Sequence, residues 1–496
     1  MLEIKNIKPE EPKKPIGTKY LSVFFIRRTK VVFSSIVFLY IFLPIMLIIY
    51  FIIPNKFKNA IMIAASLIFF AWGEIRYIFI MLLLAVMDFI CGKKINQYWE
   101  EKNKKRLFLF IDISVNLLIL FFFKYADFII GNINNMTHLN IPLLHIPLPI
   151  GVSLNTFQSL SYIIDVYRGT VKYEKSFYNY LAYTTLFPQI IAGPIVRYEN
   201  VDEELENKKI SIDNFTVGIK RFIIGLGKKV LIANNIGALW NLIETGDYGN
   251  LTFVLAWFGI IAFALQIYFD FSGYSDMAIG LAKIFGMDFN ENFNLPYISK
   301  SITEFWRRWH ITLSSWFRDY IYIPLGGNRK GLVKQIRNIL IVWFLTGAWH
   351  GASWNFILWG LYFGVILILE KIFILKMLDK AGKICSHIYA IVLILIGWVI
   401  FAFEDLSKIG MYLQAMFNVN NFINNETLYY LRNYGGIAII GIICSTALVK
   451  KLIDKLNKST NKSCKVVEII MYMMILILCT ANLVSDSFNP FLYFRF

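Results

Sequence analysis

The chain has 496 residues, of which 57% are hydrophobic and only 17% are charged. A soluble globular protein usually has about 25% charged residues, so this composition excludes an ordinary soluble protein. The 50 basic and 33 acidic residues give a net charge of +17. Nucleic-acid binding is nevertheless not expected, because the basic residues form short clusters between long apolar runs, which is typical of a multi-pass membrane protein whose loops contact membrane lipids.

Residues 1–30 are polar and basic and lack an apolar stretch followed by a cleavage site, so they are not expected to be a secretory signal. We predict an N-terminal extension over 1–30 and a single membrane domain over 31–496. The five cysteines are scattered and form no CxxC pair, which indicates neither a zinc site nor a disulfide framework.

Apolar runs that could cross or nearly cross a bilayer follow one another along the chain. A span of about 30 Å needs about 20 helical residues, so the shorter runs are expected to be re-entrant or half-helices inside the protein. We therefore predict an all-α polytopic protein with about 10 to 12 transmembrane or re-entrant helices. The runs lie at about 31–53, 58–73, 77–91, 107–130, 178–196, 214–240, 251–282, 336–348, 354–376, 388–404, 436–452 and 466–486.

The middle of the chain, about 149–360, is dense in Trp, Arg, His, Asp and Gly. Charged groups at membrane depth are costly and usually face a protein interior or a wet cavity. This density predicts that the functional site lies in the middle of the chain and that the flanking helices form a scaffold.

Asp270 and Asp276, in the segment YFDFSGYSD, are carboxylates within an otherwise apolar run. They either orient the histidines of a site or form structural ion pairs that fix helix packing, and the second interpretation is favoured. The first interpretation also includes pairing with Arg307, Arg308 or Arg318. A metal site is not expected, because no further carboxylate or histidine clusters nearby in the sequence.

A helix is predicted to begin at Ser301, with Glu304 in its first turn. On such a helix Trp306, Trp309 and Leu313 share one side, and Glu304 and Arg308 are spaced to pair. Aromatic and cationic side chains together are typical of a membrane interface. The glycine-rich segment that follows, up to residue 331, predicts a turn into a basic loop.

His350 stands in the uncharged stretch 344–356, between Gly347 and Gly351. Burial there disfavours the protonated imidazole and keeps it available as a base. The two glycines permit close approach of a ligand or another chain segment. This environment suits removal of a proton from a hydroxyl as it attacks a thioester. The alternatives are a hydrogen-bonded structural histidine at His350 and an interfacial polar residue at His310.

The segments FWRRWHITLSSWFRDYIYIPLGGNR and LTGAWHGASWNF resemble the signature of the membrane-bound O-acyltransferase family. They are most similar to its bacterial branch that includes the alginate O-acetylation membrane protein. The resemblance covers about 31–370 and implies a ring of tilted helices around a central tunnel. An acyl donor would reach this tunnel from the cytoplasm and an acceptor from the other side. Further segments that resemble this branch lie at 149–169, 187–198, 225–234, 265–280 and 291–305.

By this resemblance, His350 corresponds to the catalytic histidine of the family and acts as general base. His310 corresponds to a second polar residue of the active site, which orients or polarises, supported by Arg318 and Asp319. The resemblance implies acetyl-CoA as donor substrate, with no permanently bound cofactor, and a polysaccharide acceptor outside the cytoplasm. It also implies a partner, an extracytoplasmic SGNH-hydrolase-like acetyltransferase that completes acetylation, and a location in the bacterial cell membrane.

Lys229, Arg329 and Lys330 could hold the phosphates of coenzyme A. The alternative is that they only set the topology of the protein in the membrane. Two other functions remain open at this stage. One is D-alanyl transfer to teichoic acid within the same family, and the other is a transporter or flippase, since ionisable residues inside spans also mark transport pathways.

Overall fold

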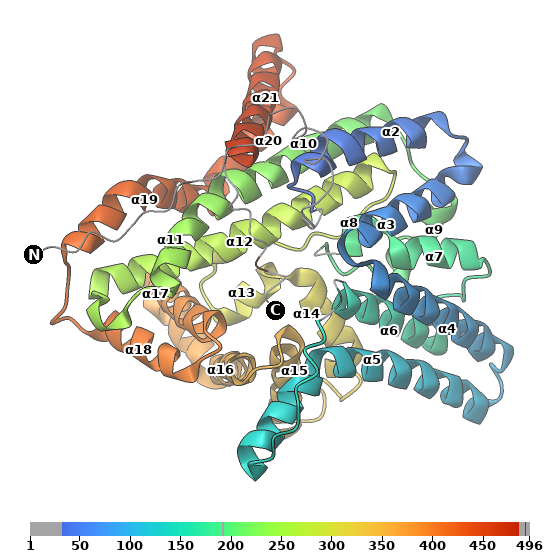
Figure 1. Cartoon of the computed structure of the whole chain (residues 1–496), viewed down its shortest axis with the longest axis horizontal. Coiled ribbons are helices and arrows are strands. Elements are labelled where there is room, and N and C mark those ends of the chain that lie inside the picture. Colours follow the sequence, from blue (N-terminus) through green and yellow to red (C-terminus); the bar gives the residue numbers. More distant parts are fainter. Residues whose placement is uncertain (1–31, 148, 150, 191–192, 486–491, 493–496) are drawn as a thin grey trace, which may run out of the picture.

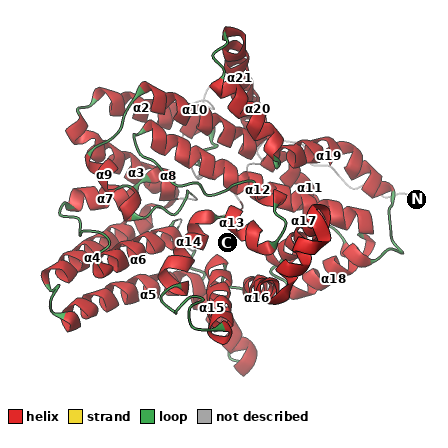
Figure 2. Ribbon diagram, turned by 180° about the vertical axis from the view of Figure 1, so that it is seen from behind, coloured by secondary structure: helices red, strands yellow, loops and turns green. Residues whose placement is uncertain are grey.

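The computed structural model describes residues 32–147, 149, 151–190, 193–485 and 492. Throughout these residues the regular structure is helical (Figures 1 and 2), which confirms the predicted all-α class. The predicted N-terminal extension over 1–30 lies outside the described residues.

The helices fall into three consecutive groups along the chain. The first group is α2 (Leu43–Ile52), α3 (Lys58–Glu74), α4 (Ile78–Gln97), α5 (Lys102–Thr137), α6 (Val152–Arg168), α7 (Phe177–Thr185), α8 (Phe187–Ile190) and α9 (Asp202–Glu206). The second is α10 (Ile212–Gly227), α11 (Asn234–Glu244), α12 (Phe253–Ile284), α13 (Ile302–Arg308), α14 (Ile311–Phe317), α15 (Leu332–His350) and α16 (Trp354–Leu369). The third is α17 (Leu375–Ala402), α18 (Leu406–Phe417), α19 (Asn425–Cys444), α20 (Ala447–Lys458) and α21 (Lys462–Ser485).

Short π-helical segments continue several of these helices without a break. They are η2 (Phe38–Phe42) before α2, η6 (Lys228–Ala233) between α10 and α11, η9 (Arg318–Tyr322) after α14, and η10 (Glu370–Ile374) between α16 and α17. π-Helical turns are rare overall, but those that occur are often found at functional sites. The charged residues of η6 and η9 are therefore candidates for a functional role.

Five helical runs of the described chain are long and apolar enough to cross a membrane, and the pair α19 and α20, bent by 65°, makes a sixth. Membrane helices are therefore confirmed. The predicted number of ten to twelve also included re-entrant and half-helices, and the structure has many helices shorter than a bilayer span. The five runs are 102–137, 212–244, 253–284, 354–402 and 462–485.

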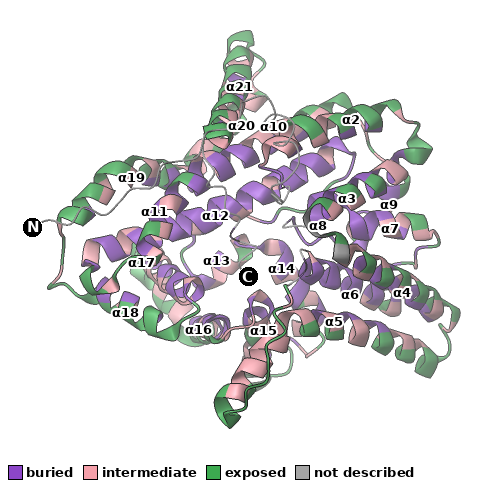
Figure 3. Ribbon diagram, viewed as in Figure 1, coloured by how far each residue is buried: buried purple, intermediate pink, exposed green. Residues whose placement is uncertain are grey.

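Helix α12 lies buried along most of its length, with other helices packed on its sides (Figure 3). Its closest neighbour is α10, because glycines allow the two backbones to touch. A Cβ atom at Gly225 would lie 2.5 Å from the carbonyl oxygen of Gly273, so no larger residue fits without moving the helices apart.

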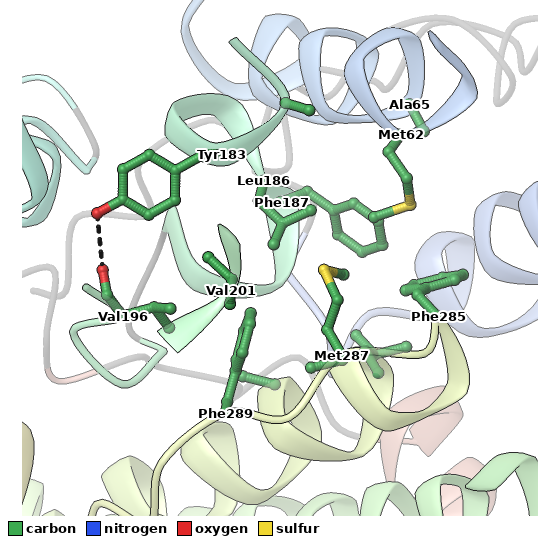
Figure 4. Close-up of a cluster of buried hydrophobic side chains, with 14 of the residues drawn as sticks. Met62, Ala65, Tyr183, Leu186, Phe187, Val196, Val201, Phe285, Met287 and Phe289 are labelled. Atoms are coloured by element: carbon green, nitrogen blue, oxygen red, sulfur yellow. Dashed lines mark hydrogen bonds between the residues drawn. The ribbon is translucent and has the colours of Figure 1, made fainter. Parts of the chain in front are cut away.

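Two large apolar cores flank α12. The first joins the N-terminal helices to α10 and to the end of α12, where Phe187 and Phe285 meet among methionines and Tyr183 donates a hydrogen bond to the Val196 carbonyl at 3.0 Å (Figure 4). The second joins α11 and α12 to α13 and to α16–α18. A smaller third cluster lies between α6, α14 and α15 and contains Phe157. Helices α13 and α14, which carry the motif with His310, lie in the middle of the molecule (Figures 1 and 2).

Candidate active site

His310 lies at a break in the predicted helix. Ser301 caps α13 through a 3.0 Å hydrogen bond from the Glu304 amide, and Arg308 pairs with Glu304 at 2.9 Å, so the predicted helix start and ion pair are confirmed. The expectation that Trp306 and Leu313 share one uninterrupted helix is wrong, because α13 ends at Arg308 and α14 begins at Ile311. Between them His310 has a φ of 43°, in the left-handed region.

Hydrogen bonds from a neighbouring loop maintain this break. The amide of Ile311 donates to the carbonyl of Asn292 at 2.9 Å, and the amide of Asn294 donates to the carbonyl of Arg308 at 2.9 Å. A non-glycine residue held at positive φ costs about 1–3 kcal/mol and is common at functional sites. The loop over 290–295 therefore fixes His310 in a conformation that a continuous helix would not allow.

The His310 side chain is 2% exposed, and its Nδ1 lies 3.0 Å from Oδ1 of Asn292. Burial lowers the pKa of His310 to about 3, so the ring is neutral at physiological pH. Its Nε2 is buried, with no hydrogen-bond partner among the described residues. The ring packs edge-on against Phe271, with centroids 4.8 Å apart.

His350 is the last residue of α15, and aromatic rings surround it. Its ring meets Trp349 at 4.9 Å, Trp359 at 5.0 Å and Phe401 at 5.3 Å, in each case edge to face. Gly347, one turn earlier, allows α15 to touch α16, since a Cβ there would lie 2.3 Å from the Phe356 carbonyl oxygen. Of the two predicted uses of Gly347, close approach of a ligand or of another chain segment, the structure shows the second, because α16 packs against this glycine.

Lys124 and Tyr125 of α5 hold the C-terminal end of α15. The Lys124 ammonium donates to the carbonyl of Trp349 and, at 3.2 Å, to that of His350, and the Tyr125 hydroxyl donates to the carbonyl of Ala348. The last carbonyls of a helix have no partner within the helix and carry partial negative charge, so a cation is favourable there. This contact was not predicted from the sequence.

A cavity opens beside His350. Its wall is almost entirely apolar and aromatic, and Phe271 takes part both in this wall and in the packing around His310. Trp349 links the two histidines as well, because its ring centroid is 6.2 Å from that of His310 and 4.9 Å from that of His350. The two predicted histidines therefore lie in one neighbourhood. The lining residues are Ile267, Asp270, Phe271, Trp309, His350, Trp359, Trp398, Phe401 and Leu492.

Asp270 and Asp276 form the structural ion pairs that were favoured from the sequence. Asp270 lies 2.6 Å from Lys229, and both side chains are almost fully buried. Asp276 lies 2.6 Å from Lys228 and 2.9 Å from Arg221. The charge of Lys229, which was predicted to hold a phosphate, is therefore compensated inside the protein.

The alternative pairing of these carboxylates with Arg307, Arg308 or Arg318 is not found among the ion pairs of the described residues. Arg308 pairs with Glu304, Arg318 pairs with Asp319, and Arg307 is exposed. The reason is geometric: η6 runs along α12, so its two lysines reach the carboxylates of α12 directly.

Arg318 and Asp319 lie in η9, which follows α14. Asp319 accepts hydrogen bonds from Arg197 at 2.8 Å and from Arg318 at 2.7 Å. Burial favours a higher pKa for this carboxyl, but the hydrogen bonds and charges of the two arginines outweigh burial and hold its pKa below the usual value. The pair thus fastens the C-terminal end of α14 to the segment that carries Arg197.

An aromatic stack connects α14 to the residue that precedes His350. Trp316 stacks on Phe157 at 4.1 Å, and Phe157 stacks on Trp349 at 5.3 Å. Arg329 and Lys330 are exposed in the predicted turn that follows η9. The structure thus brings His310 and His350 together and places the five predicted charged residues outside the cavity wall, namely Lys229, Arg318, Asp319, Arg329 and Lys330.

Among the described residues, no group of three or more His, Cys, Asp or Glu side chains could hold a metal ion. Two residues of the site were missed from the sequence. Asn292 gave no local signal, whereas Lys124 did, because a single lysine within the apolar run 107–130 is costly unless it has a specific partner.

Comparison with known proteins identifies the family. The sequence profile of the membrane-bound O-acyltransferase family matches residues 170–403. A probable alginate O-acetylase, AlgI, of Azotobacter vinelandii is 35% identical over 506 aligned residues, which cover 94% of this chain and 100% of that protein. The chain belongs to the membrane-bound O-acyltransferase family.

Other relatives widen the range of acceptors within this family. A probable alginate O-acetylase of Pseudomonas aeruginosa is 39% identical, over 78% of this chain and 75% of that protein. A peptidoglycan O-acetyltransferase of Helicobacter pylori is 33% identical, over 78% and 80%. A teichoic acid D-alanyltransferase of Bacillus subtilis is 32% identical, over only 45% and 59%. The chain is thus a membrane-bound O-acyltransferase, its named relatives are bacterial, and all the candidate site residues from Lys229 to His350 lie in the matched region.

Proposed function

We propose that this protein transfers acetyl groups from cytoplasmic acetyl-CoA toward an extracytoplasmic polysaccharide, with His350 as general base. One observation carries the proposal. Of the residues that line the cavity, Asp270 and His350 are the ones whose side chains can accept a proton from a hydroxyl, and Asp270 is ion-paired with Lys229. His350 is therefore the lining side chain available to accept a proton. The long alignments with alginate and peptidoglycan O-acetylases support an acetyl group and a polysaccharide.

In the proposed reaction, His350 takes the proton of the acceptor hydroxyl as its oxygen attacks the thioester carbonyl. The new C–O bond forms, the C–S bond breaks, and the histidine returns the proton to the departing thiolate, so that atoms and charge balance. The aromatic wall excludes water, which would otherwise compete as the acceptor. The edge-on contacts with Trp359 and Phe401 hold the imidazole plane in place.

The remaining predicted residues have roles around this centre. Arg329 and Lys330, exposed after η9, hold the phosphates of coenzyme A at the mouth of a tunnel formed by the surrounding helices. Arg318 and Asp319 position α14, and with it His310. We propose an SGNH-hydrolase-like acetyltransferase outside the cytoplasm as the partner that completes acetylation of the polymer.

The test measures release of free thiol from acetyl-CoA by purified protein in detergent with a soluble oligosaccharide acceptor. His350→Ala should lower turnover by at least about 100-fold, the usual contribution of a general base. His138→Ala is the matched control, because His138 is exposed and should leave turnover unchanged. Wild-type turnover by His350→Ala would refute the role of the histidine. Inactivity of the wild type with acetyl-CoA but activity with a D-alanyl carrier thioester would replace the donor by that of the teichoic acid branch.

A further inference from the structure

Asn292 occupies the centre of a buried hydrogen-bond network beside His310. Its side chain has no exposed surface, and its Oδ1 accepts from the Thr312 amide at 3.3 Å and from the Thr312 hydroxyl at 2.9 Å. The Thr312 hydroxyl oxygen accepts a hydrogen bond from the Ile195 amide at 3.1 Å, which leaves the hydroxyl hydrogen free to be donated to Asn292. A backbone amide only donates, so the part of the Asn292 amide that faces Thr312 is its oxygen.

This orientation decides which nitrogen of His310 carries the proton. The same Oδ1 lies 3.0 Å from Nδ1 of His310, and an amide oxygen only accepts. The Nδ1 atom is therefore the donor. A neutral imidazole has one N–H, so the lone pair stays on Nε2, which is buried and has no hydrogen-bond partner among the described residues.

We propose that Asn292 is a positioning residue that fixes His310 in the Nδ1–H form, so that His310 serves acyl transfer as a hydrogen-bond acceptor through Nε2. The part that concerns acyl transfer rests on the function proposed above. Two roles were predicted for His310, orienting a group or polarising one. The Nδ1–H form is compatible with the first role, because a hydroxyl that donates a hydrogen bond to Nε2 would be oriented by it. It excludes polarisation of the thioester carbonyl, which would need an N–H at Nε2. Phe271 joins the surroundings of His310 to the cavity wall beside His350.

The test combines a direct view of the tautomer with kinetics. Protein carrying ¹⁵N-labelled histidine is examined by NMR in lipid nanodiscs, and His310→Gln assigns the signals of that ring. Three variants are compared with wild type: Asn292→Ala removes the acceptor, Asn292→Asp keeps an acceptor and adds a charge, and Asn290→Ala is the matched control. Asn290 lies in the same loop but is exposed and bonds to Asn200 at 3.2 Å.

The wild type should show an unprotonated Nε2 on His310. In Asn292→Ala the neutral ring should exchange between its two tautomers, so that the single proton lies partly on Nδ1 and partly on Nε2. We expect Asn292→Ala to lower kcat about 10- to 100-fold, the cost seen when the partner that orients a metal-bound histidine is removed, with the KM for acetyl-CoA changed less than about 2-fold. Asn292→Asp should keep activity and move the acidic limb of the pH profile upward by about 1 unit, because a nearby carboxylate favours the imidazolium. Asn290→Ala should behave as wild type.

A protonated Nε2 on His310 in the wild type, or an unchanged tautomer in Asn292→Ala, would overturn the inference. So would equal loss of activity in Asn292→Ala and Asn292→Asp with unchanged pH profiles, since that result means a structural role alone. The NMR readout does not depend on turnover. If acetyl-CoA were not the donor, the proposed function would fail while the tautomer assignment would still be decided.

Discussion

Replacing Lys124 by methionine tests whether the C-terminal end of α15 must be held for His350 to function. The substitution keeps an unbranched side chain of similar length but removes the donor to the carbonyls of Trp349 and His350. Each buried carbonyl left without its donor costs about 1–3 kcal/mol, and loss of a cation at a helix C-terminus costs about 0.3–1 kcal/mol more. The end of the helix can recover part of this cost by shifting toward other donors.

Such a shift moves His350 directly, because it is the last residue of the helix. A displacement of about 1 Å at a catalytic group costs about 100-fold in rate, which corresponds to about 2.7 kcal/mol and lies within the range estimated from the contacts. We therefore expect Lys124→Met to lower kcat/KM for acetyl-CoA about 100-fold in the thiol-release assay. Tyr125→Phe, which removes one neutral hydrogen bond to Ala348, should cost about 5-fold.

Lys124→Arg is the matched control, since it keeps the charge and the donors, and it should retain most of the activity. A folded Lys124→Met protein with wild-type turnover would refute the argument that this contact positions the histidine. Thermal unfolding of each variant, measured by size-exclusion chromatography after heating, separates loss of position from loss of the fold.

Three further predictions concern the supports of the site. Glu370→Gln should lower thermal stability and turnover together, because this buried carboxylate accepts from the first two amides of α13, at 2.7 and 2.8 Å, and the neutral amide accepts less strongly. Asp319→Asn should be less stable than wild type by a constant difference above about pH 4, the unfolded pKa of an aspartate. The difference should shrink as the pH falls from there and vanish below the lowered folded pKa of Asp319, where the carboxyl is protonated in both states; a difference at pH 3 as large as that at pH 7 would contradict this. Gly347→Ala should fail to accumulate as folded protein, whereas Gly435→Ala, where a Cβ meets nothing within 4 Å, should express normally.

Local chemistry explains which parts of the site were predictable from the sequence. Ser301 and Glu304 form a helix start through contacts three residues apart, and the spacing of Glu304 and Arg308 shows their pairing without knowledge of the fold. His350 drew attention because it stands in a long uncharged run, and the resemblance of its segment to the family signature favoured a catalytic role over a structural one. These inferences depend on neighbours along the chain, which the sequence displays directly.

The break at His310 was not predictable in this way. The residues from Ser301 onward favour a continuous helix, and the interruption comes from the loop containing Asn292, whose carbonyl and side chain compete for the backbone and ring of residues 310–312. Lys124 shows the same limit in another form. Its presence in an apolar run signalled a specific partner, but the partner lies more than 220 positions away, and only the fold brings the two together.

The basic residues show why charge alone could not assign the donor site. From the sequence, Lys229 and Lys330 were equivalent candidates for a phosphate. The structure separates them, because Lys229 lies 2.6 Å from the buried Asp270, whereas Lys330 is exposed. Removing Lys229 from that pair to bind a phosphate would leave an uncompensated buried carboxylate beside the cavity, at a cost of several kcal/mol. The same pair keeps the cavity wall without net charge. Under the proposed function, a neutral acetyl thioester would enter beside His350 while the phosphates of the donor stay with the exposed cations after η9.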